Sequence, residues 1–126
     1  MQRVDNRLLL HADNMFYVEH GRSVGEVNQN FFTLTQSDDR QRWLSVLRSF
    51  SKRQAFSGLR MTGGQRAKQM LHHFGAEQLI HGHTPISEAN GTAPEAVLQA
   101  WIYADEQCVN VDGGLFLGGP GFVYSF

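Results

Sequence analysis

Gly75 marks the point at which the sequence changes from helical to β-type patterning. Before this glycine, apolar residues recur at helical spacing over residues 23–35, 37–50 and 65–74. The last of these segments ends at Gly75, and glycine favours the position just past a helix because it adopts left-handed backbone without strain. After it, short runs of β-forming residues alternate with polar or glycine-rich turns. The chain must therefore join a helical part to a small sheet.

N-terminal capping signals open the first two predicted helices. Ser23 and Glu26 form an S-x-x-E capping box at the start of residues 23–35. Ser37 begins residues 37–50, whose first turn carries acidic residues that favour the positive end of the helix dipole. The expected apolar face of this second helix is formed by Trp43, Leu44, Leu47 and Phe50.

A run of leucines predicts a buried strand over residues 7–11, ahead of the helices. The sequence shows nothing before this strand that would pair with it or cover it. The other expected segments are strands at 77–80, 97–104, 108–111 and 122–126, and loops at 57–64 and 87–96. A strand, three helices and then several short strands predict a mixed α/β or α+β fold in a single domain.

Composition excludes several classes of function. The formal net charge is −1 and the Lys and Arg residues are scattered, so nothing points to nucleic acid or to an anionic membrane as a partner. Cys108 is the only cysteine, which excludes an intramolecular disulfide and fits a reducing compartment. The leucine run is too short for a signal peptide or for the roughly 20 residues that cross a bilayer. We therefore expect a cytoplasmic chain.

Histidines follow two of the predicted strands. His11 ends the first strand, and His83 lies in the turn H-G-H-T-P just after residues 77–80. Because ligands collect at the carboxyl ends of strands in open α/β sheets, both rings could face one crevice. Imidazole is a common metal ligand, although two histidines far apart in sequence also fit ordinary polar loop residues. Asp13 and Asp112 are the acids at strand ends near these histidines.

Other candidate side chains have ordinary structural roles open to them. His81 shares a strand face with His83, and a satisfied structural histidine is favoured over a ligand. Asp112 is either a turn aspartate before glycine or an acceptor that orients a histidine ligand. Cys108 has no basic neighbour in sequence to activate it, so a buried thiol is favoured over a nucleophile. We expect His20 to be solvated.

Three stretches together resemble the calcineurin-like metallophosphoesterases, in their serine/threonine protein phosphatase branch. LIHGHTPI (79–86) resembles the G-H-T-P motif near the end of that domain. LLLHADNMFYVEHG (8–21) is similar to an upstream segment in which a strand ends in His-Ala or His-Gly. CVNVDGGLFLGGPGFVYSF (108–126) is similar to the closing segment, where a strand ends in Asp-x-Gly. The three stretches follow the family's order and rough spacing, and together they cover nearly the whole chain.

The resemblance implies a four-layer fold with two β-sheets inside helical layers. This chain would form the C-terminal half of that sandwich, with a mixed sheet and flanking helices. The resemblance also implies a dinuclear divalent metal site of Mn, Fe or Zn at the strand ends. By position, His11 and His83 would be ligands of the second metal, and Thr84 and Asp112 would support them. Pro85 stands where other branches carry a further histidine ligand.

The motifs of the family's first half do not occur in this sequence. Asp-x-His, Gly-Asp-x-x-Asp-Arg and Gly-Asn-His would supply the other ligands and the catalytic groups. Residues 1–126 would then be a single partial domain: a fragment, a truncated gene product or one part of a split protein. The whole enzyme would hydrolyse phosphomonoesters, with phosphoproteins among the possible substrates. We expect the chain alone to be inactive, and its partner to be the missing N-terminal half or a second copy.

Two other functions stay open at this point. A degenerate half-domain could bind another protein, or itself, through the surface that the missing half leaves open. Alternatively, a small α/β protein could hold a single metal unrelated to phosphoester chemistry. Its ligands would be His11, His83 and an acid such as Asp13 or Asp112.

Overall fold

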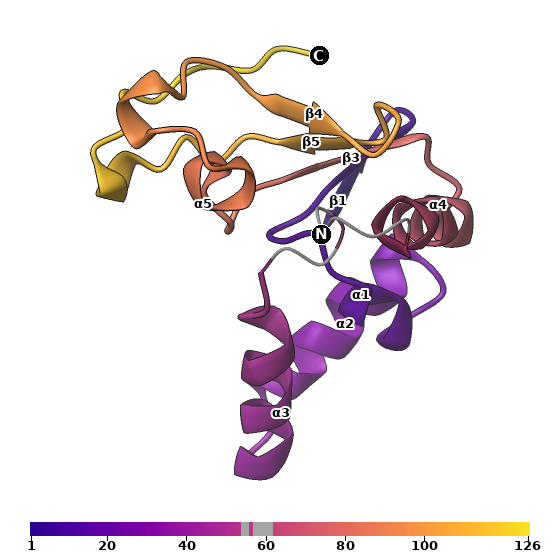
Figure 1. Ribbon diagram of the computed structural model, residues 1–126. Helices are drawn as coiled ribbons and strands as arrows, with labels where there is room; N and C mark the ends of the chain where they lie inside the picture. The colour runs from indigo at the N-terminus through magenta and orange to yellow at the C-terminus, as the bar shows by residue number, and fades with distance from the viewer. Residues whose placement is uncertain (54–55, 57–61) are drawn as a thin grey trace.

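The computed structural model describes residues 1–53, 56 and 62–126 of the chain (Figure 1). The helices are α1 (Phe16–Glu19), α2 (Val24–Thr35), α3 (Arg40–Phe50), α4 (Thr62–Phe74) and α5 (Ile86–Asn90), with short 3-10 turns at Pro94–Ala96 and Leu115–Leu117. The strands are β1 (Gln2–Val4), β2 (Arg7–Leu9), β3 (Gln78–His81), β4 (Trp101–Tyr103) and β5 (Cys108–Asn110). No helix in this part of the chain combines the length and apolarity needed to cross a membrane.

The five strands form one mixed sheet in the order β1-β2-β3-β5-β4. β2, β3 and β5 run parallel, and the edge strands β1 and β4 run antiparallel to their neighbours. The carboxyl ends of the three parallel strands therefore meet at one edge of the sheet. The predicted mixed sheet with flanking helices is confirmed. The second sheet that a sandwich requires is not present among the described residues, so the expectation of two sheets is not met within them.

β1 corrects the expectation that the first strand lacks a pairing partner. Gln2–Val4 pairs antiparallel with β2 through a tight turn in which Asp5 adopts left-handed backbone, with φ of 52°. The sequence pattern did not predict β1 because this strand has only 3 residues and they are largely exposed. Such a segment shows no run or alternation of apolar residues. The leucine strand is therefore covered on both sides within the sheet, by β1 and by β3.

The predicted helices are present, with changed starts. Ser23 caps α2 as expected, because its Oγ accepts the Glu26 backbone N–H at 3.2 Å. Asp39 rather than Ser37 caps α3, through a 3.0 Å bond from the Arg42 N–H. A carboxylate is the stronger acceptor for a helix N-terminus, and it lies directly before the first helical residue.

α4 is longer than predicted and ends where predicted. Residues 62–64, expected in a loop, form its first turn, while residues 57–61 of that loop lie outside the described part of the chain. Gly75 has φ of 65°, the left-handed conformation expected of a residue just past a helix.

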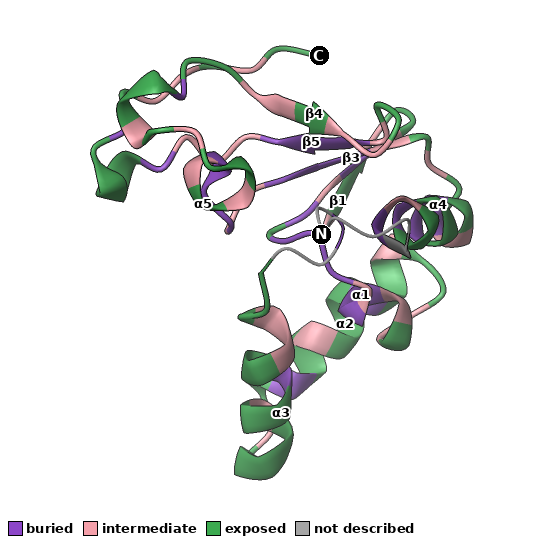
Figure 2. Cartoon of the chain, in the orientation of Figure 1, coloured by how far each residue is buried: buried purple, intermediate pink, exposed green. Residues whose placement is uncertain are grey.

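The core lies on one face of the sheet. Leu8, Leu79 and Cys108 face one another across the parallel strands in matching register, and all are fully buried. Apolar residues of α4 pack against them, including Met70 and Phe74. Figure 2 shows the same pattern, with buried residues concentrated in the central strands and along α4.

α3 extends away from the sheet and contributes little to this core (Figures 1 and 2). Val46 is its buried residue, whereas Leu44 and Leu47 of the predicted apolar face are 37% and 49% exposed. That predicted face is therefore wrong in part. Val46 belongs to the core cluster, and Trp43 and Phe50 pack against it, so the inward side of α3 is formed by these three residues.

The chain after β3 differs most from expectation. The loop predicted at 87–96 contains α5 and a 3-10 turn, and the strand predicted at 122–126 does not form. Gly118 and Gly121 adopt left-handed backbone, which breaks the extended run before residues 122–126. No strand of the described sheet pairs with that last segment.

Candidate metal-binding site

The structure brings His11 and His83 together at the carboxyl edge of the sheet. Their ring centroids lie 4.4 Å apart with an interplanar angle of 43°. Backbone pairing continues past the ends of β2 and β3, because Leu10 N–H donates to the Ile80 carbonyl and Gly82 N–H donates to the His11 carbonyl. Two segments far apart in sequence are thus held in register up to the histidines themselves.

His83 has two unusual features for an ordinary loop histidine. Its backbone is left-handed, with φ of 67°, a conformation that costs a residue with a Cβ atom roughly 1–2 kcal/mol. Its Nε2 atom is buried and has no hydrogen-bond partner among the described residues. Backbone strain and an unpaired buried polar atom concentrate at functional sites, so His83 is the strongest candidate ligand in the chain.

His11 lies between His83 and an aromatic residue. Its ring stacks on Phe50, with centroids 4.4 Å apart and planes within 1° of parallel. Burial and the neighbouring His83 lower the pKa of His11, while Asp112 acts in the opposite direction. A lowered pKa keeps the imidazole neutral, which is the form that binds metals.

Thr84 and Asp112 hold the turn that carries His83. The Thr84 carbonyl accepts a 2.8 Å bond from the Asn110 side-chain amide. The Asp112 carboxylate accepts the Gly114 N–H at 3.0 Å, and its carbonyl accepts the Ile86 N–H. Within the described chain, neither side chain bonds to either histidine ring, and Thr84 Oγ1 is buried without a partner. Their support of the two histidines therefore goes through the backbone of the turn.

A buried polar network lies beneath the histidine pair. The Tyr103 hydroxyl donates to Asp13 Oδ2 at 2.9 Å and lies 2.7 Å from His81 Nε2. The Phe56 N–H donates to the same Asp13 oxygen. Asp13 and His81 side chains are each 1% exposed, with Asp13 Oδ1 3.9 Å from His81 Nδ1. Burial, reinforced by Asp13, raises the pKa of Tyr103, so its hydroxyl keeps the proton that it donates.

This network agrees with the reading of His81 as a structural histidine and adds a residue that sequence reasoning missed. His81 Nδ1 lies 3.0 Å from the Gly82 carbonyl, so both of its ring nitrogens have partners. In the sequence, Tyr103 fits a β-forming aromatic residue of a strand. Nothing in the pattern indicates that its hydroxyl belongs to a polar network. Only the pairing of β4 with β5 places its hydroxyl near Asp13.

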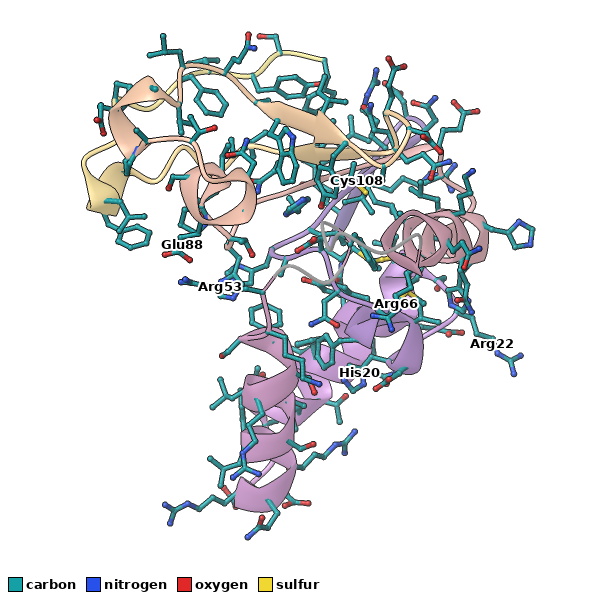
Figure 3. The ribbon with its side chains drawn as sticks, in the orientation of Figure 1. His20, Arg22, Arg53, Arg66, Glu88 and Cys108 are labelled. Carbon is teal, nitrogen blue, oxygen red and sulfur yellow. The ribbon has the colours of Figure 1, made fainter. Side chains whose placement is uncertain are left out.

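The remaining candidates have structural surroundings. His20, expected in solvent, is only partly exposed, because its ring packs edge-on against Phe16 with ring centroids 4.3 Å apart. Burial raises the pKa of the Cys108 thiol to about 12, which fits the predicted inert thiol. Figure 3 shows Arg53 pointing toward Glu88, and their ion pair of 2.6 Å ties the segment after α3 to α5.

Two histidines are fewer ligands than a metal centre needs. In residues 1–53, 56 and 62–126, no group of three or more His, Cys, Asp or Glu is placed to hold a metal ion. Comparison of the chain with protein-family models, with curated proteins and with solved structures found no match.

Replacing Tyr103 by phenylalanine should destabilise the fold by about 1–3 kcal/mol, because it leaves buried polar atoms of Asp13 and His81 without their shared partner. Urea unfolding of both proteins measures the difference. Tyr124→Phe, at a partly exposed tyrosine near the C-terminus, is the matched control and should stay within about 0.5 kcal/mol of the wild type. Equal stability of both variants would contradict the buried network.

Glycine at position 83 should be more stable than alanine there by about 0.5–1 kcal/mol, because only glycine adopts left-handed backbone freely. Both variants lack the imidazole, so the comparison isolates the backbone. At His72, inside α4, the order should reverse, with glycine about 1 kcal/mol less stable than alanine. Thermal unfolding of the four variants measures both differences. The same order at both positions would show that His83 is not strained.

Proposed function

We propose that this chain forms part of the divalent-metal centre of a phosphoesterase that hydrolyses phosphomonoesters, with His11 and His83 as ligands of one metal. The observation that carries the proposal is the contact between two imidazoles that follow neighbouring parallel strands. Their ring centroids lie 4.4 Å apart, and His83 Nε2 is buried without a hydrogen-bond partner among the described residues. The ordered resemblance of three segments to calcineurin-like metallophosphoesterases supports the phosphoester chemistry.

The residues present fit a metal in kind but not in number. Neutral imidazole nitrogen suits Zn, Fe and Mn, and His83 Nε2 has no competing hydrogen bond among the described residues. One oxygen of each neighbouring carboxylate is engaged, since Asp13 Oδ2 accepts from Tyr103 and Asp112 Oδ1 accepts from Gly114, whereas Asp13 Oδ1 has no hydrogen-bond partner among the described residues. No group of three ligand side chains is placed among the described residues, so the other ligands, including any carboxylate that bridges two metals, would come from elsewhere. Reading the transcript upstream of codon 1 tests whether such motifs precede this chain.

The chain's own contribution would be to hold two ligands rigidly. When bound, the metal ions would supply Lewis-acid stabilisation of the phosphoryl oxygens and an activated water. The register of β2 with β3, the left-handed backbone at His83 and the stack of the exposed His11 on Phe50 would orient both imidazoles for a metal. Preorganised ligands lose little entropy on binding, which is the advantage that such a scaffold provides.

Titration with Zn²⁺, followed through the imidazole NMR signals and by calorimetry, tests this proposal on the 126-residue chain. We expect weak binding that perturbs His11 and His83, and a loss of affinity of about tenfold or more in His11→Ala and in His83→Ala. His72→Ala, at an exposed histidine on α4, is the matched control and should bind as the wild type does.

Two results would contradict the proposal. Equal zinc affinity of the His72→Ala and His83→Ala variants would exclude the ligand pair. Mn²⁺-dependent hydrolysis of p-nitrophenyl phosphate by the pure chain, lost in His83→Ala, would show that the centre is complete without further ligands.

Exposed apolar side chains on β4 and on the chain after it favour a second function. This function is self-association, or binding of another protein, without catalysis. Ile102 is 49% exposed, Leu115 72%, Phe116 69% and Val123 93%. Ile102 belongs to the row of β4, β5 and β3 whose other members, Val109 and Ile80, are buried. Exposed apolar residues in such numbers are typical of an interaction surface.

Sedimentation over a wide concentration range tests this second function. We expect the chain to self-associate, and Phe116→Ser to weaken association because it removes a large apolar side chain from the surface. Phe32→Ser, at a phenylalanine of α2 that is 61% exposed, is the matched control and should leave association unchanged. A wild-type chain that stays monomeric throughout would exclude self-association.

A further inference from the structure

β4 forms one edge of the sheet, and its outer side is not paired with any strand of the described chain. We propose that β4 pairs antiparallel with β4 of a second copy of the chain, around a two-fold axis at Ile102. The inference rests on the second function proposed above, self-association, and names the surface that would carry it. Pairing across the axis would join two five-stranded sheets into one continuous sheet.

The hydrogen bonds of β5 decide which residue of β4 faces outward. On one side of β5, the Gln107 carbonyl and the Val111 N–H bond to β3, at 2.9 and 2.8 Å. Backbone groups of successive residues in a strand point to opposite sides. Cys108 and Asn110 therefore point toward β4.

Ile102 is the residue of β4 whose N–H and C=O face the open edge. Trp101 and Tyr103 lie opposite the two β5 residues that point toward β4, so their backbone groups face β5 and those of Ile102 face away. Outside the sheet ladders, no backbone hydrogen bond within the described chain reaches Ile102. In an antiparallel pair, two opposite residues that face each other exchange two hydrogen bonds. Two copies that meet at Ile102 would form such a pair on the two-fold axis.

β4 lacks the usual protection of a free edge. Residues 100–104 are Ala-Trp-Ile-Tyr-Ala, with no charged side chain and no proline. Ile102 is 49% exposed, although Val109 and Ile80, its neighbours in the same row of the sheet, are buried. A second β4 would extend this apolar row across the two-fold axis and remove Ile102 from solvent.

The two-fold register places compatible residues opposite one another. With Ile102 opposite Ile102 of the second copy, Trp101 lies opposite Tyr103, and Gln99 lies opposite Asp105. Cross-strand pairs of aromatic residues are favourable, and no two like charges meet over residues 99–105. The edge is therefore complementary to itself, which is the condition for an isologous contact.

The opposite edge of the sheet, β1, does not meet this condition. The Leu10 N–H bonds to β3, so by the same alternation Leu8 points toward β3, and Arg3, which lies opposite Leu8, faces outward. Two copies paired at Arg3 would bring two positive side chains opposite each other, and such pairs are destabilising. β4 is therefore the edge that accepts a second copy.

The space beside β4 is open. An open hollow of about 460 Å³ is lined by residues 99–102 and by Tyr124. Residues 122–126 make no backbone hydrogen bond to β4. Figure 1 shows α2 and α3 on the side of the molecule away from β4, so the helical part leaves this edge accessible. An added strand would displace solvent and not a bonded segment of the same chain.

Amide hydrogen exchange, followed residue by residue by NMR, tests the pairing directly. At low concentration the Ile102 amide should exchange fast, because its N–H faces solvent. At a concentration where sedimentation shows mostly dimer, its exchange should slow about tenfold or more. The Arg3 amide, which faces outward at the other edge, is the internal control and should stay unprotected at both concentrations.

Ile102→Lys should weaken dimerisation about tenfold or more, because it places two like charges on the two-fold axis. The side chain is half exposed and its backbone groups face away from β5, so the variant should fold, which thermal unfolding checks. Phe32→Lys introduces the same charge at a phenylalanine of α2 that is 61% exposed. This matched control should dimerise as the wild type does.

The edge pairing and the function on which it rests fail in different ways. A wild-type chain that stays monomeric would exclude self-association and the edge pairing with it. A dimer whose Ile102 amide stays unprotected, or that Ile102→Lys leaves unchanged, would retain self-association through another surface and overturn the edge pairing. Protection of the Ile102 amide already in the monomer would show that a segment of the same chain occupies the edge, which also overturns the proposal.

Discussion

Parallel pairing of β2, β3 and β5 is the constraint on which the candidate site depends. Parallel neighbours in register deliver their carboxyl ends to one edge, and the matched positions Leu8, Leu79 and Cys108 lock that register through burial. A slip by one residue would turn these side chains out of the core. The same slip would separate His11 from His83, so core packing and site geometry are set by one alignment.

The carboxyl edge carries features that cost stability. His83 is held in left-handed backbone, its Nε2 is buried without a partner among the described residues, and Asp13 keeps an unpaired carboxylate oxygen. Each of these is unfavourable by the rules that govern ordinary loops. The Tyr103 hydroxyl offsets part of the cost by bridging Asp13 and His81, and it connects β4 with β3 and with the segment that follows β2. Strain and unpaired atoms gathered at one place favour a functional origin.

His11 connects the sheet edge with the helical part of the chain. The His11 ring contacts the His83 ring, and Phe50 at the end of α3 stacks on the His11 ring. Although α3 contributes little to the core, its last residue thus shapes the surroundings of a candidate ligand.

Sequence alone determined the local structure and named the two candidate ligands. Helical periodicity, the Ser23 cap and Gly75 predicted α2 and the end of α4, because these signals act within a few residues. The placement of His11 and His83 at strand ends was readable for the same reason. Local patterning failed where the signal was weak or non-local, as at β1, α5 and the unformed strand at 122–126.

Tertiary structure decided what those residues meet. The Asp13–Tyr103–His81 network needs β4 to pair with β5, and the stack of Phe50 on His11 needs the end of α3 to lie beside the segment after β2. Strand order, ring stacking and the burial of individual atoms depend on contacts between segments far apart in the chain. A sequence pattern records which side chains are available, but long-range packing sets the distances between them, and those distances decide whether two histidines form a site.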